Sequence, residues 1–118
     1  NYTGPNPLMA KEARALKALI DNKKGSSTNV YMDVHGWTQQ ILTNTSGSGF
    51  VYATMHQYFP DNSAGGLGGG YVTRYAKEKG YSACLFEFPR NVTSHSVMVN
   101  KGYHTKFVNA IWSMITNH

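Results

Sequence analysis

Two short, β-rich apolar runs constrain this chain most, because each ends in an ionisable residue that glycine or proline soon follows. The first run covers residues 29–37 and contains His35, and the second covers residues 81–90 and contains Glu87. Open α/β sheets collect functional groups at the carboxyl ends of their parallel strands. The two runs therefore predict buried strands that bring an imidazole and a carboxylate to one edge of a sheet, as part of a hydrolytic site.

The rest of the chain alternates helical and extended patterns, which favours an α/β fold. We expect a partial mixed, largely parallel sheet flanked by helices, with a long right-handed crossover between the two main strands. The expected elements are a helix that opens at residues 5–7 and ends at Gly25, a strand at 29–35, an extended segment at 38–42, helices at 50–58 and 71–79, a strand at 82–88 and a helix at 103–117, with residues 91–101 irregular.

Two segments carry further expectations. Residues 61–70 end in a stretch in which five of six residues are glycine, and without the Gly-Lys-Ser/Thr ending of a phosphate-binding loop they predict a loop that lines a pocket. The last helix carries a single apolar stripe that we expect to face the core. The stripe consists of Phe107, Val108, Ile111, Trp112 and Ile115.

Length and charge limit the partners. We expect residues 1–118 to be a single, incomplete domain. So few strands make a thin sheet, and its uncovered edge favours a homo-oligomer. The net charge is +5, but Lys and Arg are spread along the chain, so we expect no nucleic acid. No apolar stretch approaches the roughly 20 residues of a membrane span, so we expect no membrane. The chain opens without an initiator Met, which favours a mature piece or a fragment.

For each candidate residue, a purely structural role is the alternative to a functional one. Glu87 is either a catalytic carboxylate or the partner of Arg90 or Arg74 in a salt bridge. Asp33 shares a strand face with His35, so it either orients the imidazole or is a plain polar residue, and both stay open. Cys84 lies inside the apolar run and is expected to be a buried thiol. A catalytic zinc needs three protein ligands, and no His-x-x-Glu or His-x-x-x-His motif occurs here.

Taken together in order, the segments resemble the C-terminal half of the zinc metallocarboxypeptidases, the family of carboxypeptidases A, B and T. The resemblance runs along the whole chain. The matching segments are Tyr2-Thr3-Gly4-Pro5 with Glu12 in the next helix, Met32-Asp33-Val34-His35-Gly36-Trp37-Thr38-Gln39, Ala64-Gly65-Gly66 and Leu85-Phe86-Glu87-Phe88-Pro89-Arg90.

The resemblance implies a zinc-dependent hydrolase that cleaves peptide bonds near a C-terminus. It implies that His35 is a zinc ligand, that Glu87 is the catalytic general base, and that Gly36 and Trp37 contact the peptide substrate. The family's first two zinc ligands lie upstream, so the missing N-terminal half of the domain becomes a partner, and the isolated chain is expected to be inactive and to bind its one zinc ion weakly. An extracellular or cell-envelope location is implied as well.

Three other functions stay open at this point. The parent protein could cleave peptidoglycan stem peptides with the same fold. The chain could instead be a non-catalytic binding or assembly module, although the presence of both His35 and Glu87 speaks mildly against this. The third function, a cysteine hydrolase built on Cys84, is the weakest of the three.

Overall fold

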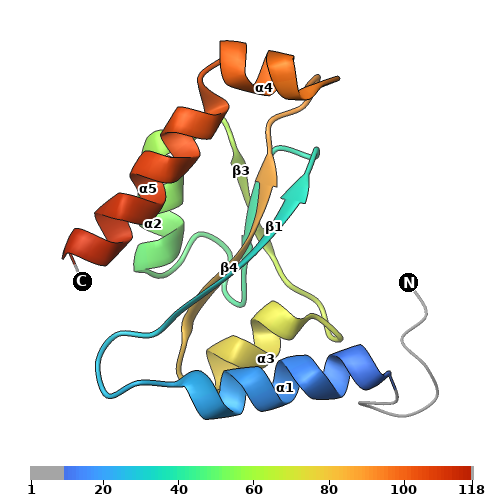
Figure 1. Cartoon of the computed structure of the whole chain (residues 1–118), viewed down its shortest axis with the longest axis vertical. Coiled ribbons are helices and arrows are strands. Elements are labelled where there is room, and N and C mark those ends of the chain that lie inside the picture. The colour runs from blue at the N-terminus through green and yellow to red at the C-terminus, as the bar shows by residue number, and fades with distance from the viewer. Residues whose placement is uncertain (1–9, 118) are drawn as a thin grey trace.

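The computed structural model describes residues 10–117, which form five helices and one four-stranded sheet (Figure 1). The expected start of the first helix at residues 5–7 and the motif at residues 2–5 lie outside this range. The elements are α1 (Lys11–Lys23), β1 (Val30–Gly36), β2 (Gln40–Thr43), α2 (Phe50–Tyr58), β3 (Ser63–Gly66), α3 (Val72–Glu78), β4 (Ser82–Phe88), α4 (His95–Asn100) and α5 (Tyr103–Asn117).

The sheet has the strand order β1-β4-β2-β3. Strands β1 and β4 are parallel, β2 and β3 are parallel, and β2 runs antiparallel to β4. This confirms the expected α/β class with a mixed, largely parallel sheet flanked by helices. The sheet also confirms that the two long apolar runs lie side by side and point the same way.

Strand β4 is the centre of the molecule because its sequence is apolar on both faces. Cys84 and Phe86 are completely buried, and so is nearly all of Leu85. Alternation places Cys84, Phe86 and Phe88 on one side, where they join the main core with Met55 of α2. A continuous apolar run of this kind is typical of a strand covered on both sides, which explains why the bounds of β4 were predictable.

The helices form two groups on opposite faces of the sheet. Helices α2 and α5 lie together along one side, whereas α1 and α3 lie across the amino-terminal ends of β1 and β4 (Figure 1). Ile20 of α1 packs in a second small core with Ala76, Tyr81 and Ala83, and the Tyr81 hydroxyl donates to the carbonyl oxygen of Ile20 at 2.6 Å. The carboxyl ends of β1 and β4 extend beyond α1 and α3.

The expectation for the face of α5 is wrong in part. Ala110 and Met114 are its buried residues, and Phe107 packs against the core. Trp112 and Ile115 are instead 64% and 66% exposed, and Val108 is also exposed. The apolar residues of α5 therefore occupy two faces of the helix, and only one of them is covered by residues 10–117.

The glycine-rich segment does not form the expected pocket-lining loop. Residues 63–66 form β3, which pairs in parallel with β2, so Gly65 lies opposite Leu42. A Cβ atom at Gly65 would lie 2.5 Å from Leu42 Cδ2. Here glycine makes room for a neighbouring side chain within the sheet. The segment expected to be irregular at 91–101 also contains α4, whose first turn is capped by Ser94 through its hydroxyl and the Val97 amide.

Candidate functional site

The parallel pairing of β1 and β4 brings the two ionisable residues singled out by the sequence into neighbouring positions. His35 is the register partner of Glu87, and Gly36 is the partner of Phe88. Both side chains point to the face that carries α1 and α3, because Phe86 and Phe88 point into the core on the other side. Those helices cover only the other ends of the strands, so this pair stays accessible to solvent.

Asp33 contacts the imidazole directly. His35 Nε2 lies 3.0 Å from Asp33 Oδ1, and the two side chains are 48% and 33% exposed. The contact favours the interpretation that Asp33 orients the ring over that of a plain polar residue. A carboxylate at one ring nitrogen fixes the orientation of an imidazole and leaves the other nitrogen for a ligand or a proton.

The carboxylate of Glu87 contacts the backbone of the turn after β1, and neither of the two arginines considered from the sequence is its partner in an ion pair among residues 10–117. Its Oε2 accepts a hydrogen bond from the Thr38 amide at 3.3 Å. The ion pair of Arg74 is with Glu78, at 3.6 Å, and Arg90 donates from Nε to the Thr38 carbonyl oxygen at 3.3 Å. The carboxylate of Glu87 therefore helps to hold the turn that follows β1.

A buried amide fixes the backbone of the same strand end. Asn62 is 2% exposed, and its Nδ2 donates to the Glu87 carbonyl oxygen at 2.8 Å. The backbone N–H of Gln39 donates to the Phe88 carbonyl oxygen at 3.1 Å. The backbone N–H of Arg90 donates to the side-chain oxygen Oε1 of Gln39 at 3.2 Å. These contacts join segments that are far apart in the sequence, and no local sequence motif indicates them. The sequence analysis therefore did not identify Thr38 and Asn62 as neighbours of Glu87.

Gly36 and Trp37 directly follow His35, which forms a cluster with Asp33 and Glu87 at the carboxyl ends of β1 and β4. Trp37 is about half exposed, and its ring centroid lies 6.0 Å from that of Phe88. A Cβ atom at Gly36 would meet nothing within 4 Å, so the backbone here is open on its side-chain face. The peptide bond between the two residues is cis. The Trp37 ring therefore packs against Phe88, on the face of the sheet opposite to His35 and Glu87.

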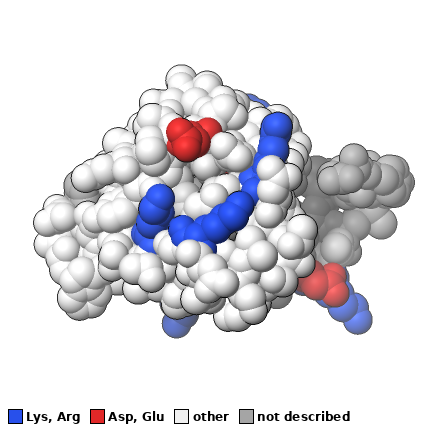
Figure 2. All heavy atoms as spheres, turned by 90° about the horizontal axis from the view of Figure 1, so that it is seen from above, with Lys and Arg blue, Asp and Glu red and all other residues white. Residues whose placement is uncertain are grey.

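Figure 2 shows the molecule from above, the direction in which β1 and β4 point. Most of this face is uncharged, and an arc of basic side chains lies beside one acidic group. Charges of both signs are therefore present, and the face is neither a purely basic nor a purely acidic surface.

The described residues do not suit a zinc ion by themselves. Within residues 10–117, no group of three His, Cys, Asp or Glu residues could hold a metal ion. His35 and its neighbours offer fewer ligands than a catalytic zinc requires. A zinc site at His35 would need ligands from outside this range.

Cys84 is a buried thiol, as expected. Burial raises the pKa of Cys84 to about 12, and the negative charge of Asp33 adds to this effect. A nucleophilic cysteine needs a lowered thiol pKa and access to its substrate, and Cys84 has neither.

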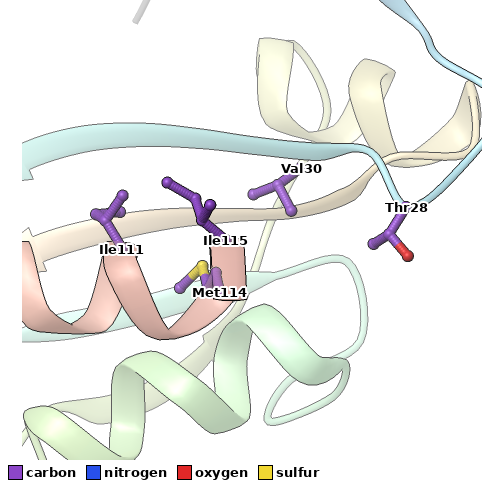
Figure 3. A pocket seen from close by; sticks show the side chains of 5 residues that line it. All are labelled: Thr28, Val30, Ile111, Met114 and Ile115. Carbon is purple, nitrogen blue, oxygen red and sulfur yellow. The ribbon is translucent and has the colours of Figure 1, made fainter. Parts of the chain in front are cut away.

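An apolar groove lies away from this cluster, between the start of β1 and α5 (Figure 3). Its volume is about 350 Å³, and in the close view Ile111 and Ile115 point from α5 toward β1, where Val30 faces them. The lining residues are Thr28, Val30, Ile111, Met114 and Ile115.

In the part of the chain that the structure describes, no helix has the length and apolarity to cross a membrane.

Comparison with known proteins changes the functional interpretation. No family model matches the chain, and no solved structure matches it. The chain is similar to bacteriocin BCN5 of Clostridium perfringens, with 29% identity over 117 residues. The alignment covers 97% of this chain but only 13% of the relative's length, so the chain spans about an eighth of that protein.

These findings correct the resemblance to the zinc carboxypeptidases. The prediction of a peptide hydrolase and metalloprotease was wrong, because the similarity found is to a bacteriocin and residues 10–117 contain no three-ligand metal group. The alternatives of a peptidoglycan hydrolase and of a non-catalytic module find no support in the comparisons either. The quoted motifs are short, and an ionisable residue at the end of a parallel strand is common to many unrelated α/β proteins.

Proposed function

We propose that this chain is a domain of a larger, secreted antibacterial protein of the bacteriocin kind. The similarity to bacteriocin BCN5 along nearly all of the chain is the observation that carries this proposal. Such a protein acts outside the cell that makes it, and this supports an extracellular location without a specific place in the cell envelope. The chain spans 13% of the relative's length, and this supports a complete protein with several domains that carry out separate tasks.

Within this domain, the cluster at the carboxyl ends of β1 and β4 is the part that contacts the target molecule. The imidazole of His35 and the carboxylate of Glu87 can each bind a polar group and exchange a proton with it. Asp33 holds the imidazole, at 3.0 Å, and the partly exposed Trp37 follows two residues after His35 in the chain. A zinc ion belongs to this proposal only if other parts of the longer protein supply further ligands to His35.

Growth inhibition by the complete polypeptide tests the proposal. The variant Glu87→Gln keeps an oxygen that accepts from the Thr38 amide but removes the negative charge. We expect the inhibitory dose to rise by about tenfold or more, the effect of losing one charge-assisted hydrogen bond. Glu78→Gln is the matched control, because Glu78 is an exposed acid on α3 that pairs with Arg74.

Thermal unfolding of both variants separates a lost contact from a lost fold. Equal inhibition by the unchanged protein and by Glu87→Gln would contradict the role of the cluster. A complete polypeptide that inhibits no bacterial strain would contradict the antibacterial function itself.

A further inference from the structure

Among residues 10–117, strand β1 has one edge that pairs with no other strand. Its strand neighbour among residues 10–117 is β4, and β1 is the outermost strand of the sheet. The Ser82 amide donates to the Asn29 carbonyl oxygen at 2.8 Å, so the peptide groups of Asn29 and of every second residue after it point toward β4. The peptide groups of Val30, Met32 and Val34 therefore point away from the sheet. An open row of this kind is a template for another strand.

The same edge is flanked by apolar side chains. Val30, Met32 and Val34 point to the face covered by α2 and α5, since Met32 packs against the core there and the strand alternates. Val34 is 44% exposed, and the groove between Val30 and α5 is open. Ile115, which lines the groove (Figure 3), is 66% exposed, and Trp112 of the same helix is 64% exposed. Several exposed apolar side chains and an apolar groove next to a free strand edge indicate an interface.

We propose that an extended segment from another part of the same longer polypeptide docks on this edge as a fifth strand. Aliphatic side chains at alternate positions of that segment fill the groove beside Val30 and Ile115. The inference rests on the proposed function, which places the chain within a longer protein. The relative has most of its length outside the aligned part, and a segment tethered to the domain meets the edge at a high effective concentration.

The docked strand also reaches the candidate functional site. Asp33 and His35 lie on the opposite face of β1 from Val34, so side chains on that face of a fifth strand would border them. The site on β1 is therefore completed from one side by the rest of the protein.

Hydrogen–deuterium exchange tests this proposal in the complete polypeptide and in the 118-residue chain. We expect the amides of Val30, Met32 and Val34 to exchange about 100-fold more slowly in the complete polypeptide. The amides of Leu85 and Phe86 in β4 serve as internal references, because their exchange reports the folding of the domain itself. Comparing β1 with β4 within one molecule keeps the result valid if the short chain is less stable.

Two lysine variants sharpen the test. Val34→Lys places a charge on the docking edge, whereas Val99→Lys places one on α4 at a side chain of similar exposure, 47% compared with 44%. In the complete polypeptide, Val34→Lys should abolish the slow exchange of β1 and leave β4 unchanged, and Val99→Lys should alter neither. In the 118-residue chain both variants should unfold at the same temperature as the unchanged protein.

Three results would overturn the inference. The first is equally fast exchange of β1 in both proteins, and the second is unaltered β1 exchange in Val34→Lys. The third is slow β1 exchange in the 118-residue chain that disappears on dilution, because a second copy would then occupy the edge. Slow β1 exchange in a complete polypeptide without antibacterial activity would support docking and contradict only the proposed function.

Discussion

The buried thiol of Cys84 gives a pH dependence that can be worked out from the structure. Burial raises its pKa to about 12, compared with 9.0 for an ordinary thiol. Above pH 9 the unfolded chain loses this proton while the folded chain keeps it, so the folded state loses stability as the pH rises. The contribution is fully present below pH 9 and is lost between pH 9 and about 12.

The size of the effect follows from the width of that window. Each pH unit costs about 1.4 kcal/mol, so the folded state loses about 2 kcal/mol from this group between pH 9 and pH 10.5. Tyr and Lys side chains also titrate in this range, but they are common to the unchanged protein and to Cys84→Ala. The difference in unfolding free energy between the two proteins isolates the thiol.

Urea unfolding under reducing conditions, at pH 8 and at pH 10.5, measures that difference. The unchanged protein should be the more stable of the two at pH 8, because alanine leaves a cavity at a fully buried position. Its advantage should shrink by about 2 kcal/mol at pH 10.5. An advantage of the same size at both pH values would refute the reasoning that the thiol is desolvated in the folded state.

Three further substitutions test the packing and the backbone of the domain. Phe86→Ala removes a fully buried ring at the centre of the core and should cost about 3–5 kcal/mol in urea unfolding, whereas Trp112→Ala on the exposed face of α5 should change stability by less than about 0.5 kcal/mol in the 118-residue chain. Gly80→Ala forces a side chain into a backbone conformation with φ of 93° and should cost about 1 kcal/mol or more, whereas Gly68→Ala, where a Cβ meets nothing within 4 Å, should be close to neutral. Asn62→Ala leaves the Glu87 carbonyl oxygen without its donor and should cost about 1–3 kcal/mol, with faster amide exchange at the end of β4 as the specific sign.

The parts of the fold that were predictable are those in which local pattern and tertiary burial agree. The bounds of β4 follow from a continuous apolar run, and those of α2 and α5 follow from helical spacing. The strand β3 was missed because glycine has a low strand propensity, and its glycine at 65 makes sense only with Leu42 beside it. The exposed face of α5 was missed because periodicity shows that residues share a face but does not show which face is covered.

The candidate site also has one part that was predictable from the sequence and another part that was not. The neighbouring positions of His35 and Glu87 followed from parallel strands that end together. Alternation placed Asp33 and His35 on one strand face but left open whether they make contact, as they do in the structure. The contacts of Thr38 and Asn62 depend on backbone groups brought from other segments, which leave no trace in local sequence. The family resemblance misled because it rested on short motifs at strand ends, where many unrelated proteins place ionisable residues.

The most direct test of the central claim is a growth-inhibition assay with the full-length protein that, in the proposed function, contains this domain. The account predicts that the purified protein inhibits bacterial strains other than its producer, that Glu87→Gln raises the inhibitory dose by about tenfold, and that Glu78→Gln leaves it unchanged. A well-folded complete protein that inhibits no strain would contradict the claim.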